Sequence, residues 1–195
     1  SQHWPLILFL AIAGLVIVYL YKRFGGKASK GMGLIFEVGH AREEKIPLVL
    51  VPLIMLTTWM SHLFGGSVGR EGVAVQIGAT LSHRFARHIK IPDASRIFLM
   101  TGMAAGFAGL FQTPLAATFF ALEVLTVGEL QLMALYPALI ASIVASFTSH
   151  ALGLEKFAVP LRETLSWTPE TLIKVALLGL AFGLAGKLFA VSLSW

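Results

Sequence analysis

Long apolar runs recur from one end of the 195-residue chain to the other, and no other feature limits its fold so strongly. A helix needs about 20 mostly apolar residues to cross the ~30 Å hydrocarbon core of a bilayer. A secretory signal would form one N-terminal block, so it cannot account for runs spread over the whole length. Charged residues make up only 13% of the chain, whereas soluble domains average about 25%. The sequence therefore predicts an all-α, polytopic membrane protein.

The hydropathy pattern divides the chain into spans and half-helices of a single membrane domain, 1–195, with no soluble domain. The predicted segments are 4–21, 33–38, 46–64, 73–87, 94–111, 114–127, 130–152 and 170–195. The segment 33–38 is too short to cross and is expected to be a half-helix or re-entrant element. Several others are bounded by glycine or proline. Such broken helices survive in a membrane only where protein or a water-filled cavity satisfies their polar groups, which is typical of a transport path.

Basic residues gather in two stretches, 22–45 and 84–96, which the positive-inside rule places on the cytoplasmic side. An even number of crossings must then separate the two stretches, and 46–64 followed by 73–87 supplies them. We therefore assign the surplus of 15 Lys+Arg over 10 Asp+Glu to orientation in the bilayer and not to nucleic acid binding. The chain has no cysteine, which excludes disulfides and thiolate chemistry. Because Ser1 and Trp195 both adjoin apolar runs, we expect a piece of a longer protein.

A glycine-rich stretch between two apolar segments holds the charged pair Arg70 and Glu71. A helix that starts near Gly72 would present unpaired N–H groups and a partial positive charge, which together form an anion site. Glu71 would stand at this tip, so its carboxylate could fill the anion position when ionised and leave it when protonated. The alternative is a capping glutamate that pairs with Arg70 at the membrane surface.

A second glycine pair, Gly31 and Gly33 on either side of Met32, precedes the short segment 33–38. It would aim a second helix N-terminus inward from the cytoplasmic side, so that two helix tips meet at one anion. The alternative is a flexible loop followed by an amphipathic surface helix. Neither glycine motif has the spacing of a phosphate-binding loop or of a dinucleotide-binding fingerprint.

The histidines do not have the pattern of a metal site. His83 and His88 are five residues apart, which is about 140° around a helix, and no carboxylate joins them. We therefore expect no metal and no cofactor. An intramembrane enzyme is the least favoured function, because the sequence offers no pairing of a nucleophile with a base.

Two motifs resemble the CLC family of chloride channels and anion/proton antiporters. The stretch 69–72 and the Val-Ala-Val-Gln-Ile-Gly that follows it are similar to the family's G-[KR]-E-G-P signature and the helix after it. The stretch 104–116, which runs on to 120–123, is similar to the family's next helix pair. The resemblance covers nearly the whole chain, from what would be the third family helix to about the tenth, and implies part of the inverted-repeat CLC fold. The first two helices and the second repeat, with the tyrosine that completes the anion site, would lie outside it.

Three departures from the general family pattern resemble its fluoride/proton antiporter branch. Met32 stands where most members have the serine of G-S-G-I-P, and Val73 stands where the signature ends in proline. Val124 occupies the position of an internal proton-transfer glutamate in chloride/proton exchangers, directly after Glu123. A thioether in place of a hydroxyl removes a donor that helps to hold chloride.

The resemblance implies fluoride export by fluoride/proton antiport, with Glu71 as the gating and proton-coupling residue. The anion-binding residues would be Met32, Gly33, Gly69, Arg70, Gly72 and Val73. The resemblance also implies a homodimer formed through 130–152 and 114–127, in a cell membrane that we expect to be a bacterial inner membrane. The transported partners would be fluoride or chloride, and protons. Alternatives are a chloride/proton antiporter, a passive chloride or fluoride channel of the same fold and, more remotely, a non-transporting membrane scaffold.

Overall fold

The computed structural model describes residues 8–42, 45–126, 128–154 and 168–193, and among these residues the regular elements are all helices. The chain divides into two compact units, Ser1–Phe157 and Ala158–Trp195. In the second unit the described part is α9, Pro169–Leu193, which has no buried residue and is long and apolar enough to cross a membrane.

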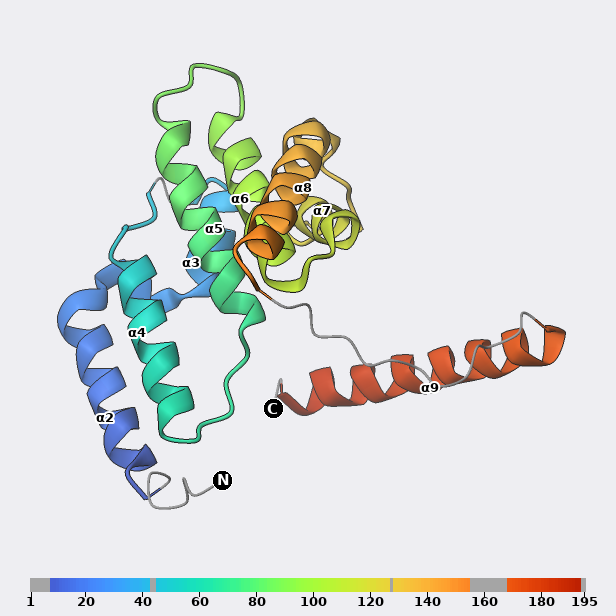
Figure 1. Cartoon of the computed structure of the whole chain (residues 1–195), viewed down its shortest axis with the longest axis horizontal. Coiled ribbons are helices and arrows are strands. Elements are labelled where there is room, and N and C mark those ends of the chain that lie inside the picture. Colours follow the sequence, from blue (N-terminus) through green and yellow to red (C-terminus); the bar gives the residue numbers. More distant parts are fainter. Residues whose placement is uncertain (1–7, 43–44, 127, 155–167, 194–195) are drawn as a thin grey trace. The chain divides into compact units, whose positions relative to one another are not determined.

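The first unit is a bundle of helices of very different lengths (Figure 1). Its α-helices are α2 (Leu10–Leu20), α3 (Met32–Gly39), α4 (Leu50–Leu63), α5 (Glu71–Ala86), α6 (Ala94–Phe111), α7 (Pro114–Glu123) and α8 (Leu135–Ala151). A π-helical turn, η1 (Tyr21–Gly25), and a 3-10 helix, η2 (Gly26–Lys30), join α2 to α3, and a 3-10 turn, η3 (Leu132–Ala134), precedes α8.

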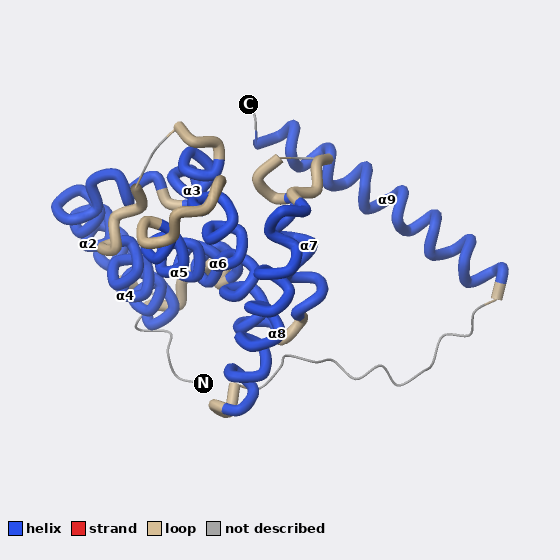
Figure 2. Tube along the Cα trace, turned by 90° about the horizontal axis from the view of Figure 1, so that it is seen from above, coloured by secondary structure: helices blue, strands red, loops and turns tan. Residues whose placement is uncertain are grey.

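The pair α5 and α6 forms the centre of this unit. Helices α2 and α4 lie on one side of the pair, and α7 and α8 lie on the other, in both the side view and the view from above (Figures 1 and 2). The short helix α3 packs against both members of the pair, and its residues Leu34 and Ile35 are completely buried. The predicted alternative of an amphipathic surface helix at 33–38 is therefore wrong.

Glycine allows α5 and α6 to approach each other at backbone distance. A Cβ atom at Gly78 would overlap the carbonyl oxygen of Gly102, and one at Gly106 would overlap that of Ala74. At the other end of the crossing, the hydroxyl of Ser82 donates a hydrogen bond to the carbonyl of Phe98 at 2.6 Å. In a bilayer, where apolar burial between helices gains little, such close packing is the main source of helix association.

Buried hydroxyl groups join the other helices to this centre. The hydroxyl of Ser149 on α8 donates to the carbonyl of Gly109 on α6 at 2.6 Å, and that of Thr118 on α7 lies 3.3 Å from the hydroxyl of Ser142 on α8. The apolar core around them is centred on Leu99 and Met103 of α6. The small-residue spacing of α6 thus serves close packing on two sides.

Several predicted boundaries differ from those observed. Helix α6 matches 94–111, but α5 begins at residue 71 instead of 73, and α7 ends at residue 123 instead of 127, which itself lies outside the described residues. The segment 46–64 is helical only from residue 50. Before it the chain forms turns, in which the Leu50 amide donates to the Pro47 carbonyl and the Val51 amide donates to the Leu48 carbonyl. In the predicted span 4–21, residues 4–7 lie outside the described residues, and the helical backbone continues past residue 21 into η1 and η2.

Helix length separates the long apolar helices from the shorter ones. Helix α4 has 14 residues, which is about 21 Å, shorter than the ~30 Å hydrocarbon core. Among the described residues, the helical segments that are long and apolar enough to cross a membrane alone are 94–111, 132–151 and 169–193. Helices α3, α4, α5 and α7 are shorter than these three.

The glycine crossing predicts a stability difference between two alanine substitutions. We expect Gly78→Ala to lower the free energy of unfolding in detergent by about 1–3 kcal/mol, because the new methyl group forces α5 and α6 apart. Gly14→Ala on α2 is the control, since a Cβ there meets no atom within 4 Å. Titration with a denaturing detergent measures both; equal stability of the two variants would contradict the close crossing.

Candidate functional site

The N-terminus of α5 presents unpaired amide groups. Arg70 is the residue before the helix, Glu71 is its first residue, and no side chain caps it. The first intrahelical hydrogen bond runs from the Ala74 amide to the Arg70 carbonyl at 3.0 Å. The amides of Glu71, Gly72 and Val73 therefore have no acceptor within the helix, and the helix dipole adds about half a positive charge at this point.

The N-terminus of α3 has the same character. Gly31 precedes the helix with φ +54° and ψ −124°, a conformation that L side chains rarely adopt. Its carbonyl accepts from the Leu34 amide at 3.1 Å, so the amides of Met32 and Gly33 come before the first bond of the helix. Met32 is half-buried and Gly33 is exposed, which leaves this helix start open to a small ligand.

Gln76 lies between the two helix starts. A Cβ atom at Gly31 would lie 3.5 Å from Oε1 of Gln76, and one at Gly72 would lie 3.8 Å from its Nε2. The side chain is 8% exposed, and its Oε1 is buried with no hydrogen-bond partner among the described residues. Gln76 is on α5, one turn after Gly72, so its side chain is the group that links the start of α5 to Gly31 at the start of α3. Sequence reasoning missed this side chain, and the meeting of the two tips at one anion stays a prediction.

The carboxylate of Glu71 turns back over Gly69. A Cβ atom at Gly69 would lie 2.7 Å from Oε2 of Glu71, closer than real Cβ contacts, so glycine at this position makes room for the carboxylate. Both residues, and Arg70, are exposed. No ion pair joins Arg70 to Glu71 in the part of the chain that the structure describes, and the predicted alternative of a capped, paired glutamate is not formed.

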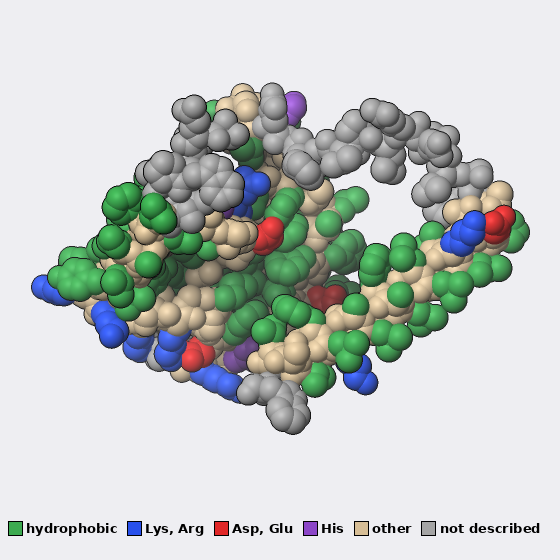
Figure 3. Space-filling model, turned by 90° about the horizontal axis from the view of Figure 1, so that it is seen from below, with side chains coloured by type: hydrophobic (Ala, Val, Ile, Leu, Met, Phe, Trp, Pro, Cys, Tyr) green, Lys and Arg blue, Asp and Glu red, His purple; other side chains and the backbone are tan. Residues whose placement is uncertain are grey.

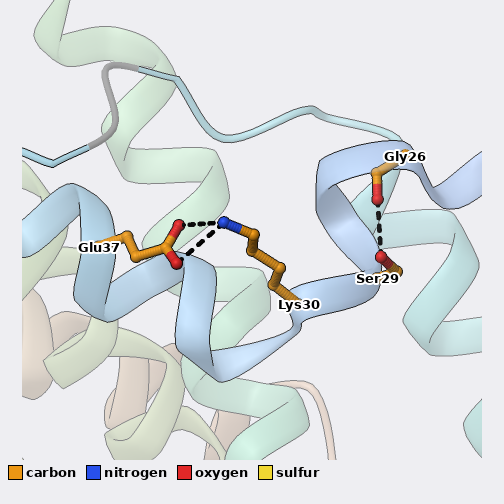
Figure 4. Close-up of polar contacts among 4 residues, drawn as sticks. All are labelled: Gly26, Ser29, Lys30 and Glu37. Carbon is orange, nitrogen blue, oxygen red and sulfur yellow. Dashed lines mark hydrogen bonds and ion pairs between the residues drawn. The ribbon is translucent and has the colours of Figure 1, made fainter.

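An ion pair fixes the approach to α3. The ammonium group of Lys30 lies 2.9 Å and 2.7 Å from the two carboxylate oxygens of Glu37 (Figure 4). In the preceding 3-10 helix, the hydroxyl of Ser29 donates to the carbonyl of Gly26 at 2.7 Å. The pair spans the Gly31 turn from η2 to α3. Its seven-residue separation exceeds the three or four residues at which side chains pair along one helix, which explains why the sequence did not reveal it.

The other acidic and metal-binding candidates lie apart from this arrangement. Glu123 is exposed at the end of α7, and Val124 packs against the apolar core. Among the described residues there is no group of three or more His, Cys, Asp or Glu side chains that could hold a metal ion.

Comparison with known proteins shows which family, relatives and solved structure the chain is similar to. Residues 13–195 match the sequence model of the family described as voltage gated chloride channel. The chain is 37% identical over 193 residues to a chloride/fluoride channel protein of Pseudomonas syringae pv. tomato, covering 98% of this chain and 43% of the relative. It is 30% identical over 193 residues to the voltage-gated ClC-type chloride channel ClcB of Yersinia pseudotuberculosis, covering 95% of this chain and 46% of the relative.

A solved structure is similar as well. The crystal structure of a CLC-type fluoride/proton antiporter matches with a TM-score of 0.87 and 50% identity, over 93% of this chain and 46% of that one. The chain thus spans about half the length of the relatives it matches. The all-α membrane architecture expected from the sequence is confirmed by this match.

The position of Gln76 predicts a role in anion binding. We expect Gln76→Leu to weaken halide binding about tenfold or more, because a hydrogen bond to a charged group contributes about 1.5–3 kcal/mol. Isothermal titration calorimetry with fluoride and chloride on the full-length gene product measures the dissociation constants of both halides. Thr80→Val is the matched control, since Thr80 is buried one turn further along α5 and its hydroxyl donates only to the Gln76 carbonyl. Equal effects of the two substitutions would contradict the role.

Proposed function

Because the chain belongs to the voltage gated chloride channel family, or CLC family, we propose that its protein carries fluoride across the membrane in exchange for protons. The names of two relatives, a chloride/fluoride channel protein and a fluoride/proton antiporter, support this substrate and this coupling. The activity is transport, in which the anion passes through without chemical change.

One observation supports the proposal: the side chain of Gln76 on α5 reaches Gly31 at the start of α3, and Glu71 is the first residue of α5. Each tip attracts an anion through its unpaired N–H groups and its dipole, and the two effects add where the tips converge. A desolvated halide needs such donors, because it loses its hydration shell on entering the protein. Backbone amides supply these donors without the cost of burying a charged side chain.

Competition for the α5 tip explains how protons would be coupled to fluoride. The ionised carboxylate of Glu71 and a fluoride ion are both negative, so the same amides hold one of them at a time. When the carboxyl takes up a proton, its attraction to the tip falls and the amides become available to fluoride. When fluoride leaves, the carboxyl releases its proton and returns to the tip. The proposal is an exchange because the proton enters from the side to which fluoride leaves and is released to the side from which fluoride came.

Two side chains near the tips favour fluoride over chloride in this proposal. Met32 brings a thioether to the start of α3, where a serine hydroxyl would donate a hydrogen bond to chloride. Gln76 provides an amide donor that can rotate toward a small anion. The alternatives in the same family, a chloride/proton antiporter and a passive channel, keep the same tips and differ in anion preference and in proton movement.

We also propose a homodimer in a bacterial inner membrane. Helix α8 carries a row of large apolar side chains that are at least half exposed, namely Tyr136, Ile140, Ile143, Val144 and Phe147. Exposed apolar side chains of α7, Leu115 and Phe119, add to the apolar surface of the unit. Lipid or a second copy can cover such a surface, and the symmetric contact of two copies is the commonest closed arrangement.

The gating role predicts that Glu71→Gln abolishes proton movement while fluoride movement persists, because the amide cannot exchange a proton. Liposomes that contain the full-length gene product report fluoride by electrode and protons by external pH. Glu123→Gln is the matched control and keeps its coupling, since this exposed acid lies at the end of α7. Stoichiometric proton movement in Glu71→Gln would contradict the assignment of Glu71 as the proton-coupling residue. Loss of coupling in both variants would remove the special role of Glu71.

The selectivity role predicts that Met32→Ser raises the chloride-to-fluoride flux ratio about tenfold, since a hydroxyl donor to a charged group is worth about 1.5–3 kcal/mol. Parallel efflux measurements of the two halides give the ratio. Met55→Ser serves as control, because Met55 is 38% exposed on α4 and is not part of either helix tip. A ratio unchanged by Met32→Ser would place selectivity elsewhere.

A further inference from the structure

A cavity of about 460 Å³ lies in the first unit. The C-terminal end of α5 and the segment that precedes α4 line it. Four of its lining side chains are cationic, Lys27, Lys45, Arg84 and Arg87. Glu71 stands at the opposite end of α5, and the helix has 16 residues, so the two ends are separated by roughly 22 Å. The cavity is therefore a separate place from the converging helix tips.

His83 forms part of the cavity wall and is itself buried. Its side chain is 4% exposed, and its Nδ1 lies 3.3 Å from the hydroxyl of Ser95 at the start of α6. This contact holds the ring in one orientation beside Arg84. The cavity thus has a fixed polar wall contributed by α5, besides the longer and more adaptable lysine and arginine side chains.

The cations reach the cavity from three different segments of the chain: the 3-10 helix η2, the stretch before α4, and the end of α5. Like charges gathered around one concavity repel each other and focus a positive potential into it. Glu43 and Glu44 directly precede Lys45 in the sequence and lie outside the described residues. On the face of the molecule in Figure 3, Lys and Arg side chains gather along one edge of the helical bundle.

The remaining wall is apolar. Ile46, Pro47 and Leu48 line it, and Leu48 is 43% exposed. The positive-inside rule predicts that the stretches that carry this basic surplus lie on the cytoplasmic side, where the leaflet presents anionic phospholipid headgroups. A cationic cavity with an apolar wall at the cytoplasmic surface suits a ligand that has a negative headgroup.

We propose that this cavity binds a phosphate group through Arg84, Arg87 and Lys45. Arginine presents paired N–H donors that match the geometry of phosphate oxygens, and lysine adds a mobile positive charge. An anionic phospholipid headgroup or soluble phosphate can each supply this group. The proposal depends on the membrane location of the chain and is independent of the fluoride coupling proposed above.

Direct binding measurements on the purified full-length gene product in neutral detergent test the proposal. Native mass spectrometry compares phosphatidylglycerol with phosphatidylcholine of the same chain length, and calorimetry at constant ionic strength tests inorganic phosphate. The test variant is Arg84→Gln with Arg87→Gln. The control is Lys22→Gln with Arg23→Gln, which removes the same charge from the basic stretch but does not touch the lining of the cavity.

We expect the test variant to weaken phosphatidylglycerol or phosphate binding about 25-fold, since each basic residue near an anionic group changes binding about fivefold. The control should change it less than twofold. Binding of phosphatidylglycerol alone would identify the lipid as the source, and binding of inorganic phosphate alone would identify soluble phosphate; both support the site. Equal losses in the two variants, or no binding of either phosphate probe, would overturn it. If the double variant does not fold, Lys45→Gln on the exposed rim replaces it, with an expected fivefold loss.

Discussion

The unpaired amide groups at the starts of α3 and α5 are the constraint on which the rest of the structure depends. A helix leaves its first N–H groups without intrahelical acceptors, and in a membrane such groups must find protein, water or a ligand. Here the side chain of Gln76 on α5 reaches Gly31 at the start of α3, and its Oε1 has no hydrogen-bond partner among the described residues. In our proposal, an anion is the ligand that satisfies these amide groups.

Helix α5 connects the two candidate sites of the first unit. Its backbone is held against α6 by the crossing at Gly78, Gly102 and Gly106. In our proposals, the N-terminal end binds an anion through amides and the helix dipole. The C-terminal end binds a phosphate group through the side chains of Arg84 and Arg87, whose positive charge also complements the negative end of the dipole. A single rigid helix thus presents positive potential at both ends by different means.

The sequence predicted those parts of the fold that depend on local patterns. The ends of α6 follow from an apolar run that stops at the Gln112-Thr113-Pro114 break, where Gln112 takes a left-handed conformation. The short helix α3 follows from the glycine pair around Met32. Gln76 and the Lys30–Glu37 pair escaped notice, because a glutamine within a helix and charges seven residues apart acquire meaning only when separate segments are packed together. The basic cavity likewise draws on three segments, although all three lie within the two basic stretches, 22–45 and 84–96, that were visible in the sequence.

The central claim is that the amides at the tips of α3 and α5 bind one anion together. Amide proton shifts of the labelled full-length gene product during a fluoride titration test it most directly, because a hydrogen bond to fluoride moves the amide proton downfield. The account predicts that Met32, Gly33, Gly72 and Val73 shift with one common dissociation constant, while the amides at the start of α6 do not respond. Shifts confined to one tip, or equal shifts at the start of α6, would contradict the convergence of two helix ends on one ion.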